Sequence, residues 1–241
     1  MKNKYLILIF VLVIISVGTL IWLAIAWSEN QEIKKVNISG NKIVNEEDIL
    51  KSMSSSAINN QNFEIDISKI QKLLKKNPYI QETYITHKNL NEIKVEVKER
   101  NPIASMVLEN GNLVYIDSSM NLLPYILYDN MPDVLLLNGV FQNGEIDSLA
   151  IIGSFAILNL INKDTKQYLL PLISEIDYNK SNNTFSIITS GEGAEIKLGG
   201  IHNLDTKINK MDAFYKSSYI ASNKSIKYID LRWDNQILVA N

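Results

Sequence analysis

An uncharged apolar run near the amino terminus constrains this chain more than any other feature. Residues 5–27 contain no charge and no proline. As a helix with a rise of about 1.5 Å per residue, the run would extend roughly 34 Å, enough to cross the hydrocarbon core of a bilayer. Lys2 and Lys4 precede the run, and Glu29 follows it. Because basic residues flank the cytoplasmic end of a spanning helix, we expect residues 1–4 in the cytoplasm and the bulk of the chain outside it.

A cleaved signal peptide is the alternative interpretation of the same segment. Ala24-Ile25-Ala26 has the small-x-small pattern of a signal-peptidase site. The apolar stretch before it is about 19 residues long, whereas a signal peptide has an apolar region of roughly 7–15. This length favours a retained anchor, and the sequence leaves open whether the site is ever cleaved.

Composition excludes several classes of function. The 24 basic residues nearly balance the 26 acidic ones, so the chain lacks the broad basic field that nucleic-acid binding requires. Cysteine is absent, and the two histidines, His87 and His202, have no second histidine at metal-ligand spacing. We therefore expect no metal, no cofactor, no nucleic-acid partner and no small-molecule substrate.

Residues 33–101 have the pattern of a small α+β domain. Asn45 is suited to cap a helix, and Asn77-Pro78 ends a second helix because proline cannot continue it. Alternating apolar and polar residues mark the strands. The predicted order is strand, helix, helix, strand, strand: Val36–Asn41, 45–53, 66–76, Ile80–Lys88 and Glu92–Arg100. This order predicts two helices on one face of a three-stranded sheet.

Residues 102–241 predict a second domain, mainly of antiparallel strands with covering helices. Asn110-Gly111 favours a tight hairpin turn. The predicted strands are Ile103–Leu108, Leu113–Asp117, Leu172–Tyr178, Thr184–Thr189 and Ala194–Leu198, and the helices are Ser148–Asn162 and Asp205–Tyr219. The closing segment, 226–240, alternates Ile229 and Leu231 with Asp230 and Arg232. The fold class is α+β.

Several motifs, in order along most of the chain, resemble those of the FtsQ/DivIB family of bacterial cell-division proteins. They are Val36-Asn37-Ile38-Ser39-Gly40-Asn41, Asn77-Pro78-Tyr79-Ile80, Glu99-Arg100-Asn101-Pro102-Ile103-Ala104, Val114-Tyr115-Ile116-Asp117, Leu122-Leu123-Pro124, Lys197-Leu198-Gly199, and 228–237 from Tyr228-Ile229-Asp230-Leu231-Arg232-Trp233 to Ile237. The first soluble unit resembles a POTRA domain and the second the family's β domain. Residues 131–139 match the family pattern only loosely.

The resemblance implies a scaffold without catalytic chemistry. Members of this family bind other single-pass division proteins, FtsB and FtsL, and help to bring septal cell-wall synthesis to the division site. For this chain it implies the bacterial cytoplasmic (inner) membrane, contact with lipid through residues 5–27, and FtsB/FtsL-like partners at the septum. The POTRA-like unit offers a second docking surface at Val36–Asn41 or Ile80–Lys88, and the sequence does not choose between them.

Strand addition to an open sheet edge is the physical mechanism that we predict for partner binding. The last predicted strand, Gln236–Ala240, is the candidate edge. The chain has only two arginines, Arg100 and Arg232, and both lie in the motifs above, where a guanidinium can fork across a carboxylate. The candidate partner-binding residues are Arg232, Trp233, Asn235, Gln236, Ile237, Leu238 and Val239. The alternative places Trp233 and Ile237 in the core, and Asp230, Arg232 and Asp234 on a solvated stripe.

Enzyme activity is the weaker interpretation. The sequence contains no Gly-x-Ser-x-Gly elbow, and the paired Glu46 and Glu47 favour a helix amino terminus rather than acid–base chemistry. A membrane-anchored hydrolase is therefore the least favoured function. A POTRA-bearing chaperone or transport component is the other alternative, and its uniform distribution in the membrane would distinguish it from a division protein.

Overall fold

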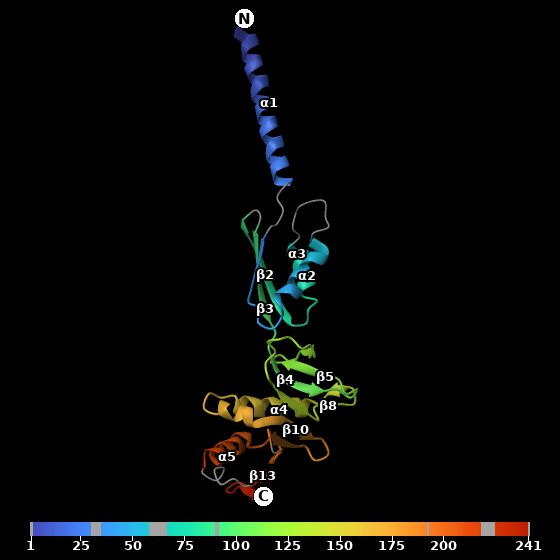
Figure 1. Ribbon diagram of the computed structural model, residues 1–241, viewed down its shortest axis with the longest axis vertical. Coiled ribbons are helices and arrows are strands. Elements are labelled where there is room, and N and C mark those ends of the chain that lie inside the picture. Colours follow the sequence, from blue (N-terminus) through green and yellow to red (C-terminus); the bar gives the residue numbers. More distant parts are fainter. Residues whose placement is uncertain are drawn as a thin grey trace. The chain divides into compact units, whose positions relative to one another are not determined.

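The computed structural model describes residues 2–29, 35–57, 67–89, 92–191, 193–217 and 225–240 (Figure 1). The chain divides into two compact units, one formed by residues 1–100 with 128–130 and the other by residues 101–127 with 131–241. Asp66, the first residue of the helix predicted over 66–76, and residues 218–219, at the end of the helix predicted over Asp205–Tyr219, lie outside the described residues. The predicted α+β class is confirmed, with an apolar helix, a three-stranded sheet with two helices, and a mostly antiparallel second sheet.

The apolar run forms one continuous helix, α1 (Lys2–Glu29). Within it, Ile9–Ala26 has a mean hydropathy of 2.8, and none of its residues is buried. A helix that exposes isoleucine, leucine and tryptophan on every side has no stable place in water. By length and composition, α1 is therefore suited to cross a membrane.

The first unit has the predicted order of elements. Its sheet has the order β1-β3-β2, in which β1 pairs in parallel with β3 and β2 pairs antiparallel with it. The elements are β1 (Lys35–Ser39), α2 (Glu46–Ala57), α3 (Ile67–Leu74), β2 (Ile80–Asn89) and β3 (Glu92–Glu99). Helix α2 continues past its predicted end at residue 53 and includes Ser54, Ser55 and Ser56. Serine has only a moderate cost in helix propensity, so these residues can remain helical.

Glu99, at the end of β3, binds the loop that follows β1. Its two carboxylate oxygens accept hydrogen bonds from the backbone N–H groups of Lys42, Ile43 and Val44, each at 2.8 Å. Before that loop, Gly40 has a φ of 86°, and a Cβ there would lie 2.2 Å from the carbonyl oxygen of Val97. The loop after β1 is therefore fixed to β3 by a glycine that permits contact and a carboxylate that satisfies the backbone.

The second unit is built on a nine-stranded sheet with the order β14-β13-β12-β11-β10-β7-β4-β5-β6. Its strands are β4 (Pro102–Val107), β5 (Leu113–Asp117), β6 (Leu122–Pro124), β7 (Leu135–Asn138), β10 (Ile173–Asn179), β11 (Thr184–Thr189), β12 (Glu195–Gly199), β13 (Tyr228–Asp230) and β14 (Leu238–Ala240). The strands β8 (Phe141–Gln142) and β9 (Glu145–Ile146) pair antiparallel as a separate two-stranded sheet. The segment that became β7 was not predicted as a strand, yet it pairs in parallel with both β4 and β10.

Two helices cover one face of this sheet: α4 (Ser148–Ile161) and α5 (Leu204–Lys216). A short 3-10 helix, η1 (Gln167–Leu172), leads into β10. Their buried side chains join those of β10, β11 and β12 in one apolar core. The side chains that alternate with these core residues lie on the opposite face of the same strands. That opposite face carries polar side chains such as Asp177, Ser186 and Lys197.

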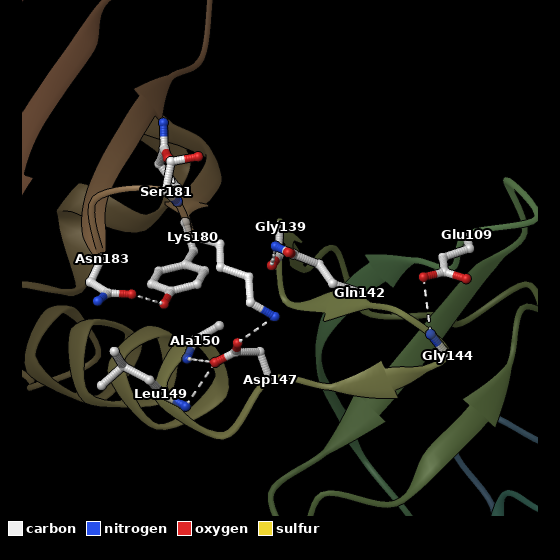
Figure 2. Close-up of polar contacts among 12 residues, drawn as sticks. Glu109, Gly139, Gln142, Gly144, Asp147, Leu149, Ala150, Lys180, Ser181 and Asn183 are labelled. Carbon is white, nitrogen blue, oxygen red and sulfur yellow. Dashed lines mark hydrogen bonds and ion pairs between the residues drawn. The ribbon is translucent and has the colours of Figure 1, made fainter.

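Helix α4 begins at Ser148, as predicted, and Asp147 caps its amino terminus. Figure 2 shows its carboxylate accepting the N–H groups of Leu149 and Ala150, at 3.0 and 3.1 Å, and pairing with Lys180 at 3.3 Å. These bonds place a negative charge at the positive end of the helix. They also join α4 to the turn between β10 and β11, which carries Lys180.

Candidate partner-binding edge

Strand β14 is the last strand at one end of the nine-stranded sheet. It pairs antiparallel with β13 through Tyr228↔Ala240, Ile229↔Val239 and Asp230↔Leu238, and it has no second neighbour among the described strands. Its other side therefore presents unpaired backbone N–H and C=O groups. The strand is shorter than predicted, because Trp233, Asp234 and Asn235 turn the chain back after β13 and extended pairing resumes at Leu238.

The turn before β14 is held by an ion pair between Asp230 and Arg232. The Asp230 carboxylate accepts hydrogen bonds from the backbone N–H of Arg232 at 3.0 Å, from its Nε at 2.9 Å and from its Nη2 at 2.6 Å. The guanidinium forks across the carboxylate as this residue type allows. Hydrogen bonding by Arg232 holds the pKa of Asp230 below its ordinary value. The predicted fork is present, and its carboxylate comes from this chain.

Asp230 was interpreted as one residue of a solvated stripe, and this alternative is wrong for it. Only 4% of Asp230 is exposed, because its side chain lies beneath that of Arg232. The Arg232 side chain remains about half exposed, at 50%. Burial of a carboxylate is costly unless it is paired and hydrogen-bonded, and Asp230 meets both conditions.

Two further residues support the turn, and neither was predicted from the sequence. Gly199 lies beneath the aliphatic part of Arg232, and a Cβ there would lie 3.2 Å from Cγ and 3.3 Å from Cδ. From α5, the Nζ of Lys210 donates to the carbonyl oxygens of Leu231 at 2.8 Å and Trp233 at 2.6 Å. The only signal for Gly199 was its place in a family-like motif, and Lys210 had no signal because its partners are more than 20 residues away.

The structure brings all seven candidate residues into the turn and the edge strand. Trp233 is 51% exposed and Leu238 is 42% exposed, so neither belongs to the core. Ile237 and Val239 are partly buried and pack against the core of the unit. Arg232, Asn235 and Gln236 are exposed. The turn therefore presents an aromatic ring, an aliphatic side chain and a half-exposed guanidinium beside the open edge.

The described residues contain no cluster of three or more His, Asp or Glu that could hold a metal ion. Asp230 and Asp234, the two aspartates of the closing segment, do not provide two free carboxylates, because Asp230 is bonded to Arg232. These residues therefore form a surface suited to a polypeptide rather than a pair of catalytic acids.

Comparison with known proteins gives matches over both soluble units. Residues 31–100 match the family model described as POTRA domain, FtsQ-type, and residues 101–240 match the one described as FtsQ/DivIB, C-terminal related. The chain is 24% identical over 212 residues to the cell division protein FtsQ of Geobacter sp. (strain M21), covering 86% of this chain and 75% of that protein. It is 25% identical over 195 residues to the cell division protein DivIB of Clostridium tetani (strain Massachusetts / E88), covering 74% and 67%. The two models match in the order predicted from the motifs, and the second alone covers more than half of the chain, so the chain belongs to the FtsQ/DivIB family of cell-division proteins.

Proposed function

We propose that this protein is a single-pass membrane scaffold of the bacterial division machinery, without catalytic activity. Its amino terminus would lie in the cytoplasm, and both soluble units would lie outside the cytoplasmic membrane at the septum. Membership of the family supports the role in division, and the length and hydropathy of α1 support the anchor. The scaffold would bind FtsB- and FtsL-like single-pass proteins and so help to recruit septal cell-wall synthesis.

The open edge of β14 is the observation that carries this proposal. An extended partner segment can add to such an edge through main-chain hydrogen bonds, while its alternate side chains meet pockets or anchors beside the strand. An edge strand left exposed is a liability in a monomer, because it invites pairing with any other chain. A binding partner that completes the sheet accounts for its retention here.

Three side chains would contribute specificity to this edge. Trp233 offers an exposed ring of the type that dominates interface energies, and Leu238 adds apolar contact. Nη2 and Nε of Arg232 are bound to Asp230, and the half-exposed guanidinium can offer its remaining N–H groups to an acidic residue of the partner. Truncation of Trp233 to alanine should weaken partner binding by about 2 kcal/mol, or roughly 30-fold in Kd.

Crosslinking in cells tests the identity of the partner. A photoreactive amino acid placed at Trp233 or Leu238 should capture an FtsB- or FtsL-like protein, identified by mass spectrometry. The matched control is Glu145, an exposed residue of β9 in the same unit. Equal capture from Glu145 and Leu238, or capture of no division protein from either edge position, would argue against the proposed edge.

Proline substitution tests strand addition itself, separately from side-chain contact. Leu238 and Val239 are consecutive, so their N–H groups point to opposite sides of the strand, one towards β13 and the other towards the open edge. Proline removes the N–H group. We expect one of Leu238→Pro and Val239→Pro to lose partner binding while keeping its unfolding temperature. If both variants fold and bind the partner normally, the main chain of β14 does not take part in partner binding.

A further inference from the structure

The polar face of the nine-stranded sheet contains a concavity that shares only Arg232 with the partner-binding residues proposed above. It has a volume of about 230 Å³ and lies over β10, β11 and β12, with Arg232 at one side. This is smaller than the roughly 300–1,000 Å³ of sites for drug-sized ligands. The concavity therefore suits a group about the size of one side chain.

Ser186 is a largely buried polar residue that lines this concavity. It is 9% exposed, and it alternates with the core residues Phe185 and Ile187, so its side chain lies on the polar face. In the sheet register it stands between Asp177 and Lys197. No other described residue forms a hydrogen bond with its hydroxyl. The hydroxyl oxygen keeps access to solvent, so it can accept a hydrogen bond from a group that enters the concavity.

The charges around Ser186 favour a cation. Lys197 lies 3.7 Å from Glu195, with its Nζ 4.5 Å from the centre of the Tyr228 ring, and Arg232 is bonded to Asp230. Asp177 accepts a hydrogen bond from the neutral amide of Asn138 at 2.8 Å. In the part of the chain that the structure describes, no basic side chain lies within ion-pair distance of Asp177. Both nearby cations are thus already paired, and one carboxylate is not.

The electrostatics agree with this geometry. Burial raises the pKa of Asp177, and the negative charge of Glu195 raises it further, against the lowering effect of Asn138. Burial also raises the pKa of the neighbouring Glu175, and Asp177 adds to that shift. A bound cation would offset the unfavourable potential at both carboxylates.

We propose that this concavity binds a primary ammonium group on a flexible aliphatic chain, such as a lysine side chain or a small aliphatic amine. The ammonium would donate to the carboxylate of Asp177 and to the hydroxyl of Ser186. Its third N–H would meet Glu195 or the amide oxygen of Asn179, which both line the concavity. The rigid sheet holds these acceptors in place, because strand register fixes Asp177 opposite Ser186.

Saturation-transfer NMR on the full chain in a nonionic detergent tests the proposal with weak ligands. The probes are n-pentylamine, which is protonated at pH 7, and the neutral n-pentanol of similar size. We expect the amine to bind saturably and pentanol to bind at least tenfold more weakly. Comparing n-pentylamine with Nα-acetyl-lysine methylamide then distinguishes the source, because a site built for a polypeptide should bind the lysine derivative more tightly.

Matched variants locate the binding. Asp177→Asn keeps the shape of the side chain and should weaken amine binding about tenfold, the loss expected for one charge-assisted hydrogen bond. Ser186→Ala should weaken it about threefold to fivefold. Glu145→Gln removes a negative charge from an exposed position elsewhere in the unit and should change nothing. Unchanged amine binding in a folded Asp177→Asn variant, or equal binding of pentanol and pentylamine, would overturn the proposal.

Discussion

Removing the charge of Asp230 should loosen the turn that presents β14. In Asp230→Asn, one amide oxygen replaces a carboxylate that accepts three hydrogen bonds, two of them from the guanidinium of Arg232. A charge-assisted hydrogen bond contributes about 1.5–3 kcal/mol when desolvated. Because the Arg232 side chain is 50% exposed, solvent screening reduces that value by roughly half. With the bond to the backbone N–H partly retained, we expect a loss of about 1.5–2.5 kcal/mol in the free energy of unfolding of the second unit.

Thermal unfolding of the full chain in detergent, followed by near-ultraviolet circular dichroism, measures this loss. The matched control is Asp234→Asn, a change of the same charge at an exposed position of the same turn, expected to cost less than about 0.5 kcal/mol. The pH dependence adds a second test. The pKa of Asp230 is lower in the folded chain than its ordinary value of 3.8, so its contribution is fully present above that pH and is lost as the pH falls through the folded pKa. Equal destabilisation by both variants at pH 7, or a difference that grows as the pH falls, would refute the reasoning.

Three other substitutions test the contacts described above. Gly153→Ala, which usually stabilises a helix interior by about 1 kcal/mol, should here cost about 1–3 kcal/mol, because its Cβ would lie 2.2 Å from Cζ of the buried Phe185. Chemical denaturation measures the change, and a stabilised Gly153→Ala variant would show that the ring can move aside. Glu99→Ala should cost the first unit about 2–4 kcal/mol by leaving three backbone N–H groups without their acceptor. Amide hydrogen exchange should then rise at residues 42–44, and unchanged protection there would contradict the role of the carboxylate. Lys210→Met should keep the apolar packing of α5, lower the unfolding free energy by about 1–2 kcal/mol, and weaken partner binding more than the Lys207→Met control. Equal effects of the two lysine variants would show that the bonds to the turn do not position the edge.

Local pattern predicted most of the elements correctly, where each one depends on neighbours in the chain. The alternation in Glu92–Arg100 gave β3 (Glu92–Glu99), and the order of the first unit followed from it and from Pro78. The predicted start of α4 at Ser148 agrees with the structure, and the cap at Asp147 was not predicted. The largest omission was β7 (Leu135–Asn138), a central strand. Its short apolar run, Leu135–Leu137, does not alternate with polar residues, because Leu136 is partly buried on the face opposite Leu135 and Leu137.

The candidate site divides in the same way. The arginine fork at position 232 was predicted from residue chemistry, and the open edge was predicted from the place of the last strand. The pairing of Arg232 with Asp230 was not predicted, because the alternating charges of the sequence do not show which residue is buried. Lys210 and Gly199 could not be found either, since each acts on the turn across a long separation in sequence.

The sequence by itself determined that residues 5–27 form an apolar helix long enough to span a membrane, because this depends only on length and the absence of charge. It also determined the helices and most strands, whose periodicity is local, and the motifs that place the chain in its family. Only the tertiary structure decided that β7 lies in the middle of the sheet and β14 at its end. It also decided that Asp230 is buried while Trp233 is exposed. These outcomes depend on pairing and packing between segments that are far apart in the chain. The burial of a residue is then set by the segments that pack against it and not by its own type.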